Sequence, residues 1–306
     1  MYNNKKIALI LIIITILFMI SAFLIYDKKI RYSEEQSDFL VWSTGDCNGA
    51  YAVLGMRTDN VTGIYNGDQV YPIDSLNNGK FVGLKYPLQV NDIIYYTTTN
   101  VETMEDCIIS KNGNDIEYII SNNIITHKRV VEDNLYYIVK HDASTSYDMC
   151  EIHCFNLKYK TNKMLIDNIN ANANFDVDDK GNILYINSNN EVVLWGGIEN
   201  KKTLGTGRTA CFWKDDYILI VKDTGLYSFS INNNSSKKLC NATGYHLELS
   251  SSNTYVALQD SVSSKSAIKN DYIQVVDLEY GRIEKIKTTP NVVLGFSWLN
   301  NCNPIY

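Results

Sequence analysis

The densest set of metal-ligating side chains in the sequence lies in five consecutive residues, Cys150-Glu151-Ile152-His153-Cys154. Thiolate and imidazole are good ligands for zinc and other soft metals, so three of them this close could begin a metal site. In a β-strand, however, successive side chains point to opposite faces. This would place Cys150 and Cys154 on one face and Glu151 and His153 on the other. The pattern therefore favours a structural strand, and we predict no metal here.

A second candidate is the acidic stretch D-V-D-D-K-G-N at Asp176–Asn182, which is similar to the start of a calcium-binding loop. A loop of the EF-hand type, however, requires Asp or Asn at the position of Lys180 and a bidentate Glu at the position of Asn187. We therefore predict an acidic β-turn before a strand, in which Gly181 adopts a positive φ.

Catalytic signatures do not occur in the sequence. It has no G-x-S-x-G elbow, no H-E-x-x-H and no glycine-rich phosphate-binding motif. The four histidines, His127, His141, His153 and His246, lie in different registers of different sequence units, so nothing in the sequence gathers them. We predict no catalytic, cofactor-binding or metal-binding set of residues, and no cofactor.

The most informative pattern is a repeat, in which a polar turn ending in Asn or Asp precedes a run of aliphatic and tyrosine residues. The last polar residues of the six turns are Asp92, Asn134, Asn182, Asp216, Asn253 and Asn303. They follow one another at intervals of 42, 48, 34, 37 and 50 residues. Short β-branched and aromatic runs joined by Asn and Gly turns indicate hairpins, and four such strands make one unit. An all-β repeat of this length predicts the blades of a β-propeller.

Two segments carry a family resemblance: F-S-W-L-N-N-C-N-P-I-Y at Phe296–Tyr306 and V-D-D-K-G-N-I-L-Y at Val177–Tyr185. They resemble the bacterial six-bladed β-propellers of the TolB-like type, in which a strand ends in a W-S-P-D-G-like turn followed by K-I-A-F/Y-like residues. The proline of that turn is absent here. The resemblance covers residues 38–306. It implies six blades and a ligand site at the mouth of the central channel, built from loops of several blades.

The two ends of the propeller are expected to share one blade. Asn291–Tyr306 supplies two strands, and Phe39–Trp42, Ala50–Met56 and Thr62–Ile73 offer candidates for the others. A ring closed by strands from both ends removes exposed sheet edges. The sequence thus favours six blades, with seven if Phe39–Ser75 forms a blade alone.

Cysteine usage adds one hypothesis about this closure. The chain has seven cysteines, so at least one cannot pair within it. Cys47 and Cys302 fall in turns of the shared blade, one from each end of the chain, and a disulfide between them would lock the ring. Closing so long a loop could contribute about 4–5 kcal/mol in the chain-entropy model. The alternative is two free thiols.

Tyrosines are the most frequent aromatic residues, with 22 in the chain. Most fall inside the repeated phrase, where we expect them to pack between neighbouring blades. Four less regularly placed aromatic residues have a better chance of lining a binding face: Tyr65, Tyr86, Trp195 and Tyr245.

The N-terminal segment, residues 1–31, is expected to be a membrane anchor. Ile7–Tyr26 contains no charged residue and is long enough, at 1.5 Å per residue, to cross a hydrocarbon core of about 30 Å. It is longer than the apolar region of a cleaved signal peptide, which is the alternative. Residues 32–37 form a short tether, and 38–306 form the propeller. A very short N-terminal tail before one large domain favours an extracytoplasmic propeller on a single-pass cell-membrane protein.

Charge excludes one class of partner. Beyond residue 31 the chain keeps 23 of its 28 basic and 33 of its 34 acidic residues, a net charge of −10. Such a surface repels phosphate backbones, so we predict no nucleic-acid binding. A closed ring without an assembled catalytic set indicates a non-catalytic binding or scaffold module for a protein, a peptide or an envelope polymer. Two alternatives remain: a cell-envelope hydrolase or lyase that uses carboxylates at the channel mouth, and a sensory or assembly subunit whose span packs against another membrane protein.

Overall fold

The structure is a computed structural model that describes residues 39–44, 60–65, 70–74, 81–113, 115–122, 124–140, 150–170, 174–197, 199–244, 246–250, 253–259, 272–287 and 293–298. All of them belong to one compact unit, Asp38–Tyr306. The segment before it, with the predicted span at 7–26 and the tether at 32–37, lies outside the described residues. Among the residues that are described, no helix is long and apolar enough to cross a membrane.

In its described part, the unit consists of four-stranded antiparallel sheets, and five of these are each built from four consecutive strands. The first has β4 (Phe81–Val90), β5 (Ile93–Asn100), β6 (Asp106–Asn112) and β7 (Asp115–Asn122). The second has β8 (Ile124–Val131), β9 (Asn134–Lys140), β10 (Cys150–Asn156) and β11 (Thr161–Ile169). The third has β12 (Asp176–Val177), β13 (Ile183–Ile186), β14 (Glu191–Trp195) and β15 (Lys201–Thr206). The fourth has β16 (Thr209–Lys214), β17 (Tyr217–Lys222), β18 (Gly225–Ser230) and β19 (Ser235–Cys240). The fifth has β20 (His246–Leu249), β21 (Tyr255–Gln259), β22 (Tyr272–Asp277) and β23 (Arg282–Lys287).

A further sheet is composite, because it joins strands from both ends of the unit. Its order is β24 (Val293–Trp298), β1 (Phe39–Thr44), β2 (Asn60–Tyr65) and β3 (Val70–Asp74). β24 and β1 are antiparallel, with Phe39 opposite Trp298. A sheet shared by both ends was predicted, with two strands from the C-terminal side. The number was wrong, because one strand comes from the C-terminal side and three come from the N-terminal side. The alternative of a blade made by Phe39–Ser75 alone is also wrong, since β24 completes that sheet. Ala50–Met56 lies outside the described residues.

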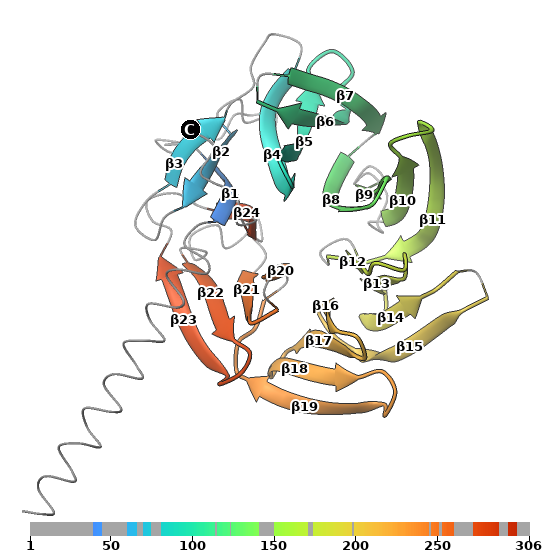
Figure 1. The fold of residues 1–306 in the computed structure, drawn as a ribbon, viewed down its shortest axis with the longest axis vertical. Coiled ribbons are helices and arrows are strands. Elements are labelled where there is room, and N and C mark those ends of the chain that lie inside the picture. The colour runs from blue at the N-terminus through green and yellow to red at the C-terminus, as the bar shows by residue number, and fades with distance from the viewer. Residues whose placement is uncertain are drawn as a thin grey trace, which may run out of the picture. The chain divides into compact units, whose positions relative to one another are not determined.

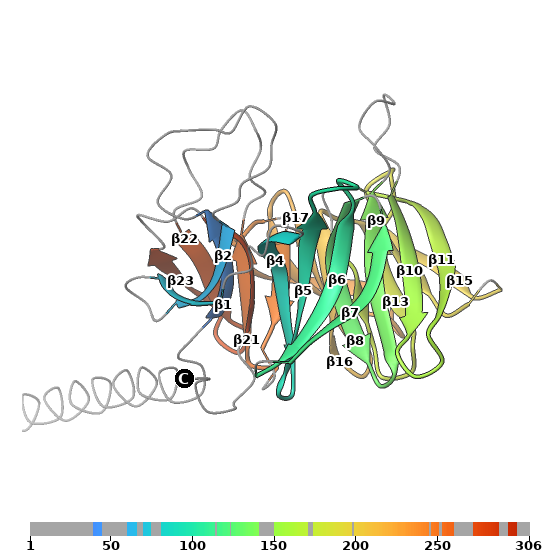
Figure 2. The same ribbon diagram turned by 90° about the horizontal axis from the view of Figure 1, so that it is seen from above.

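The sheets surround a common centre, and β4, β8, β12, β16, β20 and β24 are their innermost strands (Figure 1). Each of these inner strands contacts the inner strand of the next sheet, from β4 through β24 and back to β4. Figure 2 shows the same sheets from the side, with their strands running across the thickness of the ring. The predicted all-β propeller is therefore confirmed.

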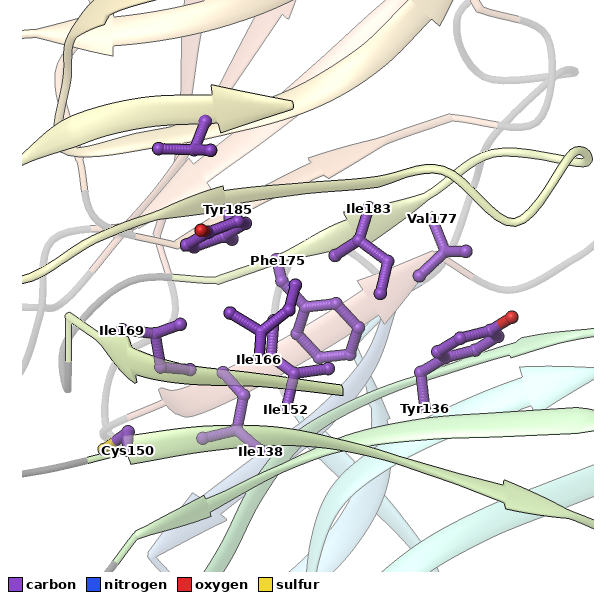
Figure 3. Packing of buried hydrophobic residues seen from close by; sticks show 11 residues of the cluster. Tyr136, Ile138, Cys150, Ile152, Ile166, Ile169, Phe175, Val177, Ile183 and Tyr185 are labelled. Carbon is purple, nitrogen blue, oxygen red and sulfur yellow. The ribbon is translucent and has the colours of Figure 1, made fainter. Parts of the chain in front are cut away.

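The core lies between neighbouring blades. β5, β9, β13 and β21, the second strands of their sheets, are buried almost throughout, because a blade covers each of their faces. Tyr96, Tyr137 and Tyr185 are among the largest fully buried side chains, which confirms that tyrosines of the repeated phrase pack between blades. In the interface drawn in Figure 3, Ile138 and Ile152 of one blade face Phe175 and other residues of the next blade.

Candidate functional site

Three charged side chains from different blades meet at the centre of the ring. Arg129 of β8 donates two hydrogen bonds through Nη2 to Glu248 of β20, 3.0 Å to Oε1 and 3.0 Å to Oε2. Its Nε donates to Oδ1 of Asp176, on β12, over 3.2 Å. The second carboxylate oxygen of Asp176 accepts the backbone N–H of Phe212, on β16, at 2.9 Å. This arrangement, the Arg129 network, links the inner strands of four blades.

Burial and charge determine the protonation of the Arg129 network. Burial acts to lower the pKa of Arg129, but Glu248 and Asp176 outweigh this effect and raise it above its ordinary value. Burial raises the pKa of Asp176, while Arg129 acts in the opposite direction. The side chains of Arg129, Asp176 and Glu248 remain 16%, 19% and 12% exposed, so solvent reaches the centre of the ring.

Two histidines lie beside this network. The rings of His127, on β8, and His246, on β20, are stacked with centroids 5.3 Å apart. Tyr86 meets His127 edge-on at 5.5 Å. Asn174 donates from Nδ2 to Nδ1 of His246 over 2.9 Å, and Nε2 of His246 lies 3.5 Å from Oε1 of Glu248. Since Nδ1 of His246 accepts a hydrogen bond, the neutral ring carries its proton on Nε2, toward the carboxylate.

His127 is held in the neutral form. Burial lowers its pKa well below the usual value, and the positive charges of Arg129 and Lys128, together with His246, act in the same direction. Lys128 points the other way from its neighbours on β8. It is buried, and its ammonium donates to the backbone carbonyl of Tyr86 and to Oγ1 of Thr97, the latter over 3.1 Å.

The strand prediction for Cys150–Cys154 is confirmed. Cys150 and Cys154 pack on one side of β10, in the interface of Figure 3. On the other side, Nε2 of His153 lies 2.8 Å from Glu151, and its ring lies 5.6 Å from that of Tyr137. In the described part of the chain, no group of three or more His, Cys, Asp or Glu residues is placed to hold a metal ion.

The turn prediction for Asp176–Asn182 is also confirmed. Gly181 has a φ of +79°, and Oδ1 of Asp178 accepts the backbone N–H groups of Lys180 and Asn182. The carboxylate of Asp178 is therefore used to hold the backbone of its own turn. Asp176, the first residue of the same stretch, contacts Arg129 instead.

The structure describes only some of the other candidates. Tyr86 lies at the centre of the ring, as its irregular position in the sequence allowed, while Trp195 packs against the interface of Figure 3. Cys47, Cys302, His141, Tyr245 and the side chain of Tyr65 lie outside the described part, so the proposed disulfide stays a prediction. Within that part, Cys154, Cys211 and Cys240 are free thiols.

The four histidines were interpreted as lying in different registers, with nothing in the sequence to gather them, and this interpretation was wrong for His127 and His246, whose rings are stacked. A signal for their meeting was present in the repeat. Each stands seven residues before the last polar residue of its turn, Asn134 or Asn253, and Arg129 and Glu248 each stand five residues before it. Because equivalent positions of inner strands lie at the same depth in the ring, residues that share such a register can meet there.

Comparisons with known proteins concern the fold alone. No protein-family model matches the chain, and none of the curated proteins matches it in sequence. Among solved structures, it is similar to TolB from Acinetobacter baumannii, with 14% identity over 66% of this chain and 68% of that one and a TM-score of 0.47. It is also similar to the β-propeller domain of the Trilobed protease from Pyrococcus furiosus, with 14% identity over 69% and 72% and a TM-score of 0.45. An oligogalacturonate lyase in complex with manganese has 9% identity over 76% and 71% and a TM-score of 0.44.

Proposed function

We propose that this protein is a membrane-anchored β-propeller that works outside the cytoplasm as a non-catalytic binding or scaffold module. Its partner would be a protein, a peptide or an envelope polymer. The single observation that supports this role is the Arg129 network, which ties the inner strands of four blades into one rigid ring. A rigid ring can present the loops at its ends as a preorganised recognition surface.

The same network argues against acid–base chemistry at its carboxylates. A general base needs a carboxylate oxygen that can reach a proton of the substrate. Both oxygens of Glu248 accept hydrogen bonds from Arg129, and those of Asp176 accept from Arg129 and from the backbone of Phe212. The carboxylates therefore act to hold the ring together.

The anchor and the ring closure complete the proposal. The uncharged run Ile7–Tyr26 would hold the protein in the cell membrane, with the propeller on the extracytoplasmic side. The composite sheet of β24 and β1–β3 would serve as the closing blade of a six-bladed ring of the TolB-like type. Because this sheet pairs strands from both ends of the unit, it fastens those two ends together.

Capture of partners from native membranes tests the binding role. The full-length protein is crosslinked in the membranes and purified by affinity, and the co-purified material is identified. We expect a protein or polymer in a constant ratio to the propeller. Purification of the protein alone, under conditions that capture known membrane complexes, would contradict a scaffold role.

The side of the membrane is tested separately with a thiol on the surface. Asn189 lies in an exposed turn between β13 and β14, so an Asn189→Cys variant places a reactive cysteine there. A membrane-impermeant thiol reagent should label this variant in intact cells more strongly than the unchanged protein. Labelling only after lysis would place the propeller in the cytoplasm.

One observation favours a second candidate, an envelope hydrolase or lyase. Asp176 and Glu248 converge on the same guanidinium, and such chemistry requires two nearby carboxylates, one of which would have to leave Arg129 to take up a proton. The measurement is release of product from envelope material by the purified protein. Turnover that is lost in both Asp176→Asn and Glu248→Gln variants would establish this alternative over the binding module.

A further inference from the structure

Four polar residues share nearly the same place in their sequence units: His127, Asn174 and His246 each stand two residues before a charged residue of the Arg129 network, and Thr209 stands three residues before Phe212. Together these four residues make up the histidine layer. Thr209 and His246 are the first residues of β16 and β20, and Asn174 stands two residues before β12. His127, Thr209 and His246 each stand seven residues before the last polar residue of their turn, so they share one depth in the ring.

Two oxygen atoms of the histidine layer are buried without a hydrogen-bond partner among the described residues: Oδ1 of Asn174 and Oγ1 of Thr209. Asn174 is 3% exposed and Thr209 is fully buried. A buried polar atom without a partner is unfavourable, so a molecule that supplies the missing hydrogen bonds gains affinity from them. Asn174 also donates to His246, whose side chain is 14% exposed, so the layer has contact with solvent at this point.

The charges around the layer decide which kind of ligand it can take. A cation is disfavoured beside His127, because Arg129 and Lys128 already act to lower the pKa of that ring. An anion is disfavoured beside the Arg129 network, where two carboxylates share one guanidinium. A neutral ligand avoids both costs.

The hydrogen-bonding groups of the histidine layer further restrict the chemical class of the ligand. Oδ1 of Asn174 can only accept, the hydroxyl of Thr209 can donate and accept, and neutral His127 offers one donor and one acceptor. An array that mixes donors and acceptors matches hydroxyl groups, which themselves do both. An amine in its ammonium form would leave the donors of the layer unused.

We propose that the histidine layer binds an uncharged sugar ring, as the end of an envelope polymer would present it. This inference rests on the proposed binding function and names the chemistry that the module recognises. Asn174 and Thr209 take hydroxyl groups of the sugar, and His127 provides a neutral polar wall. The Arg129 network closes the site on one side.

The test uses three probes with one ring shape and different charges: methyl β-D-glucopyranoside, D-glucosamine and D-glucuronate. Each is titrated at pH 6.5 into the full-length protein in detergent, and binding is followed by calorimetry and by saturation-transfer NMR. We expect saturation by the neutral glycoside alone. Thr209→Val and Asn174→Ala should each weaken its affinity about three- to tenfold, the factor that one neutral hydrogen bond supplies.

Thermal unfolding separates a binding role from a structural one. Valine has nearly the shape of threonine, and the hydroxyl of Thr209 has no hydrogen-bond partner in the described part of the chain, so Thr209→Val should keep or raise the melting temperature while it weakens binding. Thr161→Val, on the exposed outer strand β11, is the matched control and should change neither quantity.

The outcomes distinguish this inference from the proposed function. Preferential binding of glucosamine or glucuronate would overturn the inference that the ligand is uncharged. If Thr209→Val and the unchanged protein bind the glycoside with equal affinity, the assignment of the sugar site to the histidine layer is wrong. No binding of any probe, together with a protein or polymer captured from native membranes, would overturn the sugar inference and leave the binding module in place. Failure of both experiments would overturn both.

Discussion

Arg129 and Glu248 are 119 residues apart in the sequence, yet two hydrogen bonds of 3.0 Å join them across the centre of the ring. The pair connects the second and the fifth sheet of consecutive strands, which are not neighbours in the ring. The strand contacts between different sheets run mainly between neighbours in the ring, so this pair couples sheets that have few other direct contacts.

Removal of Arg129 should be strongly destabilising. Arg129→Met leaves Asp176 and Glu248 buried without their partner, and breaking a buried ion pair in this way costs about 3–5 kcal/mol. The measurement is the free energy of unfolding from urea denaturation. The triple variant Arg129→Met, Asp176→Asn, Glu248→Gln has no unpaired charge and should recover part of that loss.

A surface pair provides the control for this prediction. Arg208 donates from Nε to Asp223 over 2.7 Å, but the side chain of Asp223 is 81% exposed. Exposed pairs contribute about 0–1 kcal/mol, so Arg208→Met should change the stability by no more than that. Equal losses for Arg129→Met and Arg208→Met would show that the central network does not hold the ring together.

His127 should make the protein less stable in weak acid. The folded protein keeps this ring neutral, because its pKa is lowered well below 6.5, whereas the unfolded chain takes up a proton near that value. Below about pH 6.5 the unfolded state therefore binds more protons, and the free energy of unfolding falls as the pH falls. The contribution is fully present above pH 6.5.

A variant isolates this effect from other titrating groups. His127→Asn cannot take up the proton, so its unfolding free energy should vary less between pH 7 and pH 5 than that of the unchanged protein. Urea denaturation at half-unit pH steps measures both slopes. Identical slopes would assign the acid sensitivity to other groups.

The interface between the second and third blades should depend on Ile152. This side chain is fully buried among the residues of Figure 3. Ile152→Val should cost about 0.5–1.5 kcal/mol and Ile152→Ala about 2–5 kcal/mol, as the cavity grows. Ile116→Ala, on β7 with the side chain of Ile116 half exposed, is the control and should cost much less in the same denaturation experiment.

Gly225 should tolerate no side chain. It begins β18 with a φ of +138°, and a Cβ atom there would lie 2.1 Å from the carbonyl oxygen of Cys240. Gly225→Ala should cost on the order of 3 kcal/mol or more, from backbone strain and overlap together. Gly113→Ala, at a φ of +57° with nothing within 4 Å, meets only the strain and should cost about 1–2 kcal/mol. Similar melting temperatures of the two variants would contradict the overlap.

The blade architecture could be predicted because its causes are local. Strands buried on both faces read as continuous apolar runs, and Asn and Gly at the turns mark their starts, as at Asn253 and Gly181, both with positive φ. The strand at Cys150–Cys154 could be predicted because successive side chains of a strand point to opposite faces. Each of these features depends on a few neighbouring residues.

The centre of the ring could not be predicted in the same way. Arg129, Asp176 and Glu248 lie on three different strands, and none of them stands out from the charged residues around it in the sequence. Asp176 even belonged to a stretch that was considered for calcium. Their meeting depends on the register of each inner strand in the ring, which a single strand does not encode. For His127 and His246 the shared offset from the turn was a signal, but it points to a contact only once both strands are known to be inner strands of one ring.

The composite sheet affects the order in which the domain can fold during synthesis. As the chain is synthesised, the five blades of consecutive strands can form from nearby segments, but β1 has to wait for β24, which is made more than 250 residues later. Until then the nascent protein is an arc with two open ends. The pairing of β24 with β1 thus joins the two ends of the described unit, and any stability that depends on the closed ring begins only then.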